Sequence, residues 1–121
     1  MSSYLDEIYK LVKSRGYRVE ERGDAILVWH PSAPLALRLV VYGDTARLEL
    51  YAENIRDYLD DLVEQVGEEE ARDQLEEVLD DLSEAHALIE SVLRKRGVRV
   101  ESRFKDNVLD VLEAFEDITE S

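Results

Sequence analysis

Two histidines and a run of carboxylates are the side chains of this sequence best suited to chemistry. His86 lies in an amphipathic segment with Glu90 four residues later, a spacing that places both side chains on one side of a helix. Such a pair can bind a divalent metal. A third ligand is not identifiable, and Ser83 stands where the Glu-x-x-His pattern of helical di-metal proteins needs a glutamate. A buried or interfacial histidine, hydrogen-bonded to Glu90 or to a partner, is the favoured interpretation.

His30 is the other histidine, and it precedes Pro31 where a predicted strand ends. A polar residue at a strand end is ordinary, so His30 is not assigned to a site.

The acidic run over residues 76–84 is a second candidate. Glu76, Asp80 and Glu84 lie on one helical face, and Glu77 and Asp81 lie on another. Like charges four residues apart destabilise a helix by about 0.2–0.5 kcal/mol per pair unless a cation or a basic partner lies over them.

The pattern Glu76-Glu77-x-x-Asp80 is similar, over five residues, to the acidic helix motifs with which all-helical nucleoside-triphosphate pyrophosphatases hold magnesium. Those enzymes have no sheet, whereas strands are predicted here, and the acidic positions alternate with core leucines. A solvated helix face is therefore preferred. A divalent-metal-dependent enzyme that uses Glu76, Glu77, Asp80 and His86 is the alternative function.

Other catalytic and cofactor motifs are missing. The 121 residues contain no cysteine, which excludes thiolate metal sites, iron–sulfur clusters, disulfides and thiol catalysis. The sequence has no phosphate-binding loop, no dinucleotide-binding glycine pattern and no nucleophile-elbow motif. It therefore assigns no catalytic, cofactor-binding or metal-binding residue and favours a protein that is not an enzyme.

The charge of the chain is strongly negative and unevenly distributed. Fifteen basic and 29 acidic residues give a net charge of −14. Residues 53–90 carry fifteen acidic residues and two arginines, whereas residues 91–105 carry six basic residues and one glutamate. Over the ~8 Å Debye length of physiological salt such a surface repels phosphates, so neither free nucleic acid nor a membrane is an expected partner. A basic protein is a conceivable one.

Location and source are indicated by composition. No apolar run approaches the ~20 residues of a membrane span, and the N-terminus has no signal-type segment, so a cytoplasmic protein is expected. Arginine outnumbers lysine eleven to four, and heat-labile side chains are few, which is typical of thermophilic proteins.

Hydrophobic periodicity predicts one acidic domain over residues 1–121. The first half contains a helix over about 3–15 and strands at 17–22, 25–29, 35–42 and 46–51, with Gly43-Asp44 as a two-residue hairpin turn. The second half contains a helix over 53–66, a long helix over 68–96, a strand over 98–104 and a helix over 106–118. The predicted fold is α+β, in the order α-β-β-β-β-α-α-β-α. It has an antiparallel, mostly meander sheet of about five strands, an N-terminal helix, a central helical hairpin and a C-terminal helix.

Two basic segments, residues 13–22 and 94–103, align without gaps, and each passes from a helix end through a glycine into a basic strand. The shared chemistry of a basic helix end followed by an edge strand accounts for the similarity without a true repeat. From it we nevertheless expect strands 17–22 and 98–103 to be close together and to form a basic patch.

One face of the predicted sheet is rich in tyrosine and arginine. Tyr42 and Tyr51 share the strand parity of Arg38, Arg47 and Glu49, opposite to the leucines at 37, 39, 48 and 50. Such a face could bind bases or a peptide, or the long helix could cover it; both interpretations stay open.

The long helix carries the leading functional hypothesis. At 1.5 Å per residue it is a rod of about 43 Å, and the preceding helix offers only half that length of apolar surface to cover it. An uncovered apolar strip would favour a second copy. The sequence therefore predicts a homodimer and a non-enzymatic protein-interaction or assembly module, with these interaction residues: Leu75, Val78, Leu82, His86, Ile89 and Val92.

Overall fold

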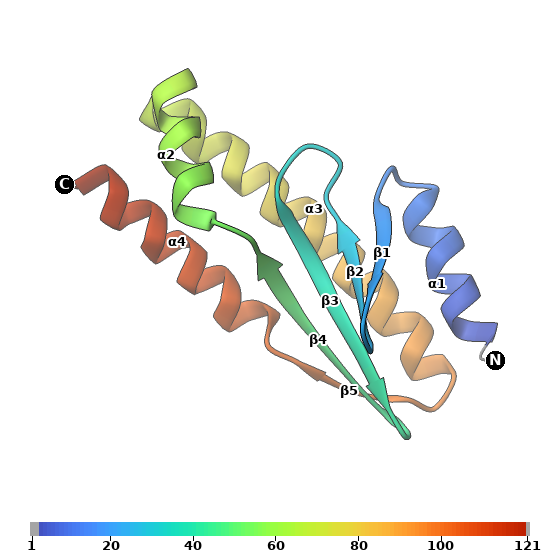
Figure 1. Cartoon of the computed structure of the whole chain (residues 1–121). Coiled ribbons are helices and arrows are strands. Elements are labelled where there is room, and N and C mark those ends of the chain that lie inside the picture. Colours follow the sequence, from blue (N-terminus) through green and yellow to red (C-terminus); the bar gives the residue numbers. More distant parts are fainter. Residues whose placement is uncertain (1–2, 121) are drawn as a thin grey trace.

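A computed structural model describes residues 3–120 of the chain. Within that range four helices and a five-stranded sheet follow one another in the predicted order (Figure 1). The elements are α1 (Ser3–Lys13), β1 (Arg18–Arg22), β2 (Ala25–Trp29), β3 (Leu35–Tyr42), β4 (Thr45–Ala52), α2 (Ile55–Val66), α3 (Glu68–Lys95), β5 (Arg99–Ser102) and α4 (Phe104–Glu120). The mixed α+β class is therefore confirmed.

The first four strands form the predicted antiparallel meander. The strands lie in the order β1-β2-β3-β4-β5, so chain neighbours are also neighbours in the sheet. Tyr42 pairs with Thr45, which leaves Gly43-Asp44 as the two-residue turn between β3 and β4. The hairpin prediction is confirmed, because alternating apolar residues and a Gly-Asp turn together fix the register.

The last strand corrects the prediction of an antiparallel sheet. β5 pairs in parallel with β4, from Thr45 opposite Arg99 to Leu48 opposite Ser102. The cause is the helical hairpin between the two strands: α2 continues beyond the end of β4, and α3 returns along the whole sheet (Figure 1). The chain therefore enters β5 from the end at which β4 began. Parallel neighbours need such a long crossover.

The two basic strands lie far apart, so the predicted basic patch is wrong. β1 and β5 are the opposite edges of the sheet. Their sequence similarity reflects two equivalent helix ends instead. The N–H of Tyr17 donates to the carbonyl of Val12 (3.1 Å), and the N–H of Val98 donates to that of Leu93 (3.0 Å). Each bond spans a glycine in the left-handed region, as in a Schellman cap.

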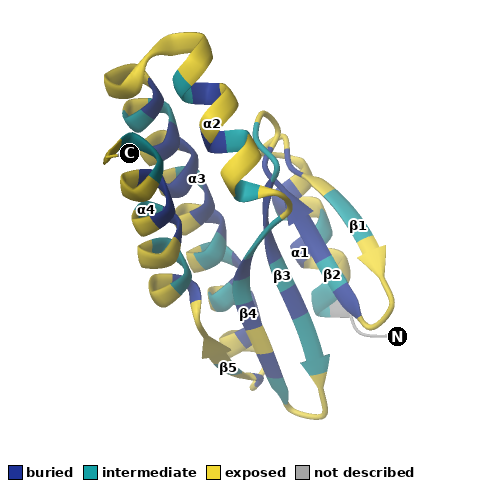
Figure 2. Cartoon of the chain, turned by 60° about the vertical axis from the view of Figure 1, so that its left-hand side comes forward, coloured by how far each residue is buried: buried dark blue, intermediate teal, exposed yellow. Residues whose placement is uncertain are grey.

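The helices cover one face of the sheet only. α1 contacts β1, α3 contacts β3 and β5, and α4 contacts β4, while α2 packs on α3 and α4 (Figures 1 and 2). Leu37 and Leu39 are fully buried on the helical side, whereas Arg38 and Glu49 pair on the other face. The predicted parity is confirmed. The long helix does not cover the tyrosine and arginine face.

The apolar stripe of the long helix is covered within a single chain. All of its predicted apolar members are buried: Leu75, Val78, Leu82, Ala85, Ile89 and Val92. The missing cover comes from α1 and α4, which pack on α3 in addition to α2 and the sheet. Within residues 3–120, no helix combines the length and the apolar character that a transmembrane span requires.

Candidate functional site

A groove between α3 and the segment from β5 into α4 is the candidate site. It has a volume of about 960 Å³, and its lining is more apolar than polar. Its lining residues from α3 are Leu79, Asp80, Ser83, His86, Ala87 and Glu90; those from the second wall include Ser102, Arg103, Phe104, Lys105, Asp106, Val108 and Leu109.

Helical periodicity explains why these side chains meet. On α3 the groove uses the flank beside the buried stripe, where Leu79, Ser83 and His86 recur at intervals of three and four residues. On α4 the pair Lys105 and Leu109 repeats one helical turn apart. Because both helices turn their main apolar stripes to the core, only their flanks remain to line the groove.

Leu109 is the most exposed large apolar residue that the structure describes. The residue is 59% exposed, compared with 46% for Tyr42 and 39% for Val66. Phe104, which also lines the groove, is buried at 6% exposure. The exposed Leu109 gives the groove an apolar surface that a partner can cover.

His86 connects the two walls of the groove. Its Nε2 lies 2.8 Å from the Ser102 hydroxyl oxygen, and its ring packs on Phe104 with centroids 5.0 Å apart. The N–H of Phe104 donates to the same hydroxyl oxygen over 3.3 Å, so the hydroxyl proton is free to bond Nε2 of a neutral imidazole. Nδ1 lies 3.7 Å from a carboxylate oxygen of Glu90.

The electrostatics of His86 favour the neutral ring. Burial lowers the pKa of His86, and the negative charge of Glu90 opposes this shift only in part. Glu90 is itself engaged by Arg94, whose guanidinium lies 2.7 Å away. His86 is therefore a structural link between α3 and the start of α4. It is half-buried, but its hydrogen-bond partner is Ser102 and not the expected Glu90 or a partner protein.

The two walls of the groove carry opposite charges. Asp80 and Glu90 lie on the α3 wall, whereas Arg103 and Lys105 lie at the start of the α4 wall, followed by Asp106. The charge of the groove lining therefore changes from negative on the α3 wall to positive on the α4 wall.

The structure separates the predicted interaction residues. Of these residues only His86 lines the groove; Leu75, Val78, Leu82, Ile89 and Val92 lie in the core. The premise of the self-association hypothesis, an uncovered apolar strip on α3, is thus not found in the described part of the chain. Self-association itself stays a prediction.

The residues of the metal-enzyme alternative are also dispersed. Asp80 and His86 share the groove, but Glu77 lines a different hollow beside His30, and Glu76 is exposed. Among residues 3–120 no group of three or more His, Cys, Asp or Glu side chains is placed to hold a metal ion.

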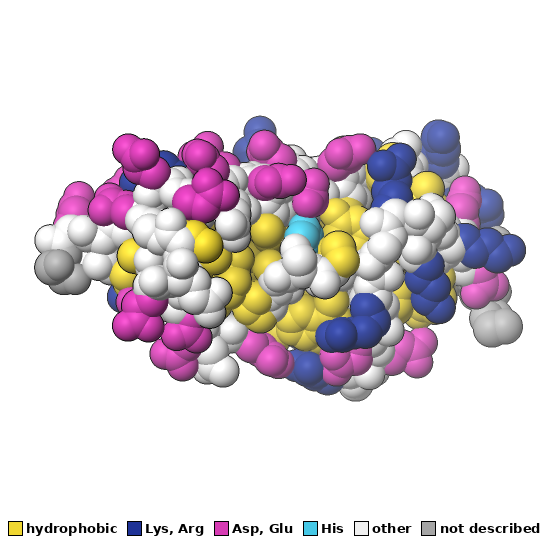
Figure 3. Space-filling model, turned by 90° about the horizontal axis from the view of Figure 1, so that it is seen from above, with side chains coloured by type: hydrophobic (Ala, Val, Ile, Leu, Met, Phe, Trp, Pro, Cys, Tyr) yellow, Lys and Arg dark blue, Asp and Glu magenta, His cyan; other side chains and the backbone are white. Residues whose placement is uncertain are grey.

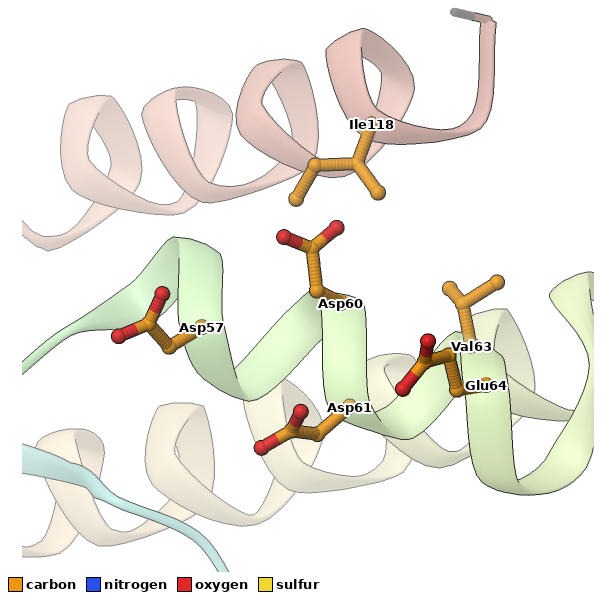
Figure 4. A pocket seen from close by; sticks show the side chains of 6 residues that line it. All are labelled: Asp57, Asp60, Asp61, Val63, Glu64 and Ile118. Atoms are coloured by element: carbon orange, nitrogen blue, oxygen red, sulfur yellow. The ribbon is translucent and has the colours of Figure 1, made fainter.

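An acidic hollow, separate from the groove, lies between α2 and α4 and has a volume of about 570 Å³. Its carboxylates are those of Asp57, Asp60, Asp61 and Glu64. They do not converge: Asp60 points toward Ile118 of α4, whereas Asp57 and Asp61 point elsewhere (Figure 4). The hollow therefore has no shared centre for a cation.

Sequence reasoning missed a buried cluster around His30. The His30 side chain is only 4% exposed, and its Nε2 lies 2.9 Å from a carboxylate oxygen of Asp81 on α3. The Tyr17 hydroxyl donates to the backbone carbonyl of Asp81 over 2.9 Å. Burial, with the charges of Asp81 and Glu84, raises the pKa of Tyr17 to about 12. No local pattern links His30 to Asp81.

Ser32, His30 and Asp81 have the composition of a hydrolytic triad but not its geometry. The Ser32 hydroxyl lies 3.3 Å from Nδ1 of His30, but the backbone N–H of Ser32 donates to that nitrogen over 3.1 Å. The single in-plane lone pair of Nδ1 is therefore occupied and cannot take the hydroxyl proton. The cluster anchors the loop between β2 and β3 to α3.

Comparisons with protein-family models, with curated proteins and with solved structures gave no match to this chain. The class of protein is accordingly defined by its fold and its groove alone: a mixed α+β protein with a helix-free sheet face and an amphipathic groove.

Proposed function

We propose that this chain is a non-enzymatic interaction module that self-associates, with two copies packing groove to groove along the α3/α4 surface. The observation that supports this proposal is the groove itself, where the exposed Leu109 lies on the α4 wall with Arg103 and Lys105, across from the acidic α3 wall. This modifies the hypothesis from the sequence, since the contacting side of α3 is its flank and not its buried stripe.

The apolar part of the groove supplies the driving force. Burial of a leucine side chain contributes about 1.5–3 kcal/mol, and somewhat less here because Leu109 is already partly covered. A twofold axis doubles this contribution, because each Leu109 enters the groove of the other copy.

The charges of the walls select the orientation of the second copy. Rotation by half a turn about an axis along the groove places the acidic wall of one copy over the basic wall of the other. Asp80 then faces the side of Arg103 and Lys105, and the reciprocal contact forms by symmetry. A rotation about an axis across the groove would set like walls together, so charge favours the first arrangement.

The net charge opposes association over longer distances. Each copy carries −14, and this repulsion acts between whole molecules, whereas the wall contacts act at close range. Salt near physiological strength screens charges more than about 8 Å apart and affects close pairs less. We expect the dimer to be more stable at about 0.15 M salt than at very low salt.

The first prediction tests the apolar contact. The Leu109→Glu variant should weaken dimerisation by about tenfold or more, measured by sedimentation velocity over a series of protein concentrations. Val66→Glu is the matched control, because Val66 is an exposed apolar residue on α2 outside the groove lining. A wild-type chain that stays monomeric at every concentration, or equal dimerisation of the two variants, contradicts the proposal.

The second prediction tests the orientation. Lys105→Glu should weaken the dimer, and adding Asp80→Lys to the same chain should restore it, because the two walls exchange their charges. Failure of the double variant to recover, while the circular dichroism spectrum stays native, would exclude the twofold arrangement.

A further inference from the structure

The helix-free face of the sheet is a second surface with chemistry of its own. Strand registers place five arginines and three glutamates on it: Arg18, Arg22, Arg38, Arg47 and Arg99, with Glu20, Glu49 and Glu101. It is thus net positive on a chain whose total charge is −14. A view from above shows acidic side chains along both long edges, with the basic side chains densest toward one end (Figure 3).

In one half of this face, which we call the closed half, charged side chains pair with one another and cover the surface. Arg22 pairs with Glu20 at 2.8 Å and with Glu53 at 3.0 Å, and Arg38 pairs with Glu49 at 2.8 Å. Trp29, only 6% exposed, donates its indole N–H to Glu20 over 2.8 Å. These contacts satisfy the polar groups and cover the small apolar cluster beneath them. No ligand is needed there.

The other half is open. Arg47 and Arg99 are exposed, and neither forms an ion pair with any residue that the structure describes. Thr45 pairs with both Tyr42 and Arg99, so these three residues form one row across β3, β4 and β5. Arg47 follows two residues along β4, on the same face. We name these four residues the arginine corner.

We infer that the arginine corner binds a short acidic peptide segment of another protein. The closed half shows the pairing that this face uses, a guanidinium with a carboxylate. Arg47 and Arg99 have no such pair among the described residues, because Glu101, the strand neighbour of Arg47, instead accepts the Tyr42 hydroxyl over 3.3 Å. Arg18 also has no ion pair with a described residue, but its guanidinium lies over the Trp29 ring, 5.8 Å from the centroid. Guanidinium groups hold carboxylates with two parallel hydrogen bonds. The 46% exposed ring of Tyr42 offers an apolar contact beside them.

Charge distribution favours a peptide over a nucleic acid. A single-stranded nucleic acid carries a negative charge at every phosphate. Where it extends past the sheet it lies over the acidic remainder of the chain and is repelled. A short acidic segment ends within the positive face. Most of the acidic surface then lies farther from it than the ~8 Å Debye length, so the repulsion is largely screened.

The test measures fluorescence anisotropy with a labelled Asp/Glu peptide of about eight residues, long enough when extended to cross the sheet. An Asn/Gln peptide of the same length and an oligothymidylate are the comparison ligands. The wild type should bind the acidic peptide, more weakly as salt rises, and neither comparison ligand should bind as tightly.

The Arg47→Glu/Arg99→Glu variant should lose about tenfold or more in affinity for the acidic peptide. Arg56→Glu, at an exposed arginine on α2, should bind as the wild type does. Leu109→Glu should also bind normally, which separates this inference from the proposed dimer. Native circular dichroism spectra of the variants exclude unfolding.

Three outcomes overturn the inference: no binding by the wild type at ~1 mM peptide, equal binding by the Arg47→Glu/Arg99→Glu variant, or tighter binding of the oligothymidylate.

Discussion

His30 is fixed by contacts from segments that are distant in the sequence. Its Nδ1 accepts the backbone N–H of Ser32, and its Nε2 bonds to Asp81 on α3. The sequence indicated the break after Trp29 and the helical position of Asp81, but nothing in either segment predicts their contact. Tertiary packing alone brings them together, which is why His30, the one buried polar residue among those that the structure describes, was not predicted as important.

Asp81→Ala should therefore destabilise the protein. It leaves a buried ring nitrogen without its acceptor, which costs about 1–3 kcal/mol, toward the lower end because the Asp81 side chain is 48% exposed and water can partly replace it. Urea unfolding measures the change. Ser32→Ala is the control and should stay within about 0.5 kcal/mol, since the backbone N–H of residue 32 still bonds Nδ1. Equal losses for both variants would contradict this assignment.

His86 makes stability depend on pH. Because its pKa is lower in the folded chain than its ordinary value of 6.5, the unfolded chain binds more protons as the pH falls through that range. The free energy of unfolding should therefore decrease from about pH 7.5 to about pH 5.5. The measurement is urea unfolding at both pH values, with His86→Gln as the comparison. A decrease of the same size in His86→Gln would assign the effect to other groups.

At the scale of elements, local sequence patterns were sufficient to predict strand pairing wherever neighbours in sequence are also neighbours in space. The meander from β1 to β4, its Gly43-Asp44 turn and the two faces of β3 and β4 follow from alternation and turn chemistry. The parallel β5, the separation of β1 from β5 and the cover of α3 by α4 depend on where a long crossover ends. Such placement is decided by packing between distant segments, on which periodicity gives no information.

The two Schellman caps make a matched test of element boundaries. Gly16 has φ 92° and Gly97 has φ 75°, and nothing lies within 4 Å of the position of an added Cβ at either. An alanine there meets only backbone strain, about 1–2 kcal/mol. Gly16→Ala and Gly97→Ala should thus lower the free energy of unfolding by similar amounts, measured by urea unfolding. Asparagine, which tolerates the left-handed region, should cost less at both positions, and no loss on substitution by alanine would refute the cap assignment.

At the scale of the whole molecule, the fold keeps its two open surfaces apart. The groove lies in the helical layer, and the arginine corner lies on the sheet face that carries no helix. The acidic residues that dominate the net charge are concentrated in the helices α2, α3 and α4, so the sheet can be locally positive while the whole chain stays strongly negative. The composition gives the total charge, but how the charge divides between the helical layer and the sheet follows only from the topology.

The parallel pairing of β5 with β4 has a consequence for how the chain folds during synthesis. Strands β1 to β4 can pair as soon as residue 52 is available, because each is joined to the next by a short connection of two or five residues. The outer edge of β4 then stays unpaired until the whole helical hairpin has been made and has folded back. An open strand edge beside buried leucines is a template for pairing with other chains. Residues 99–120, which form β5 and α4 and follow the helical hairpin in the chain, are therefore the ones that close this edge of the sheet against aggregation.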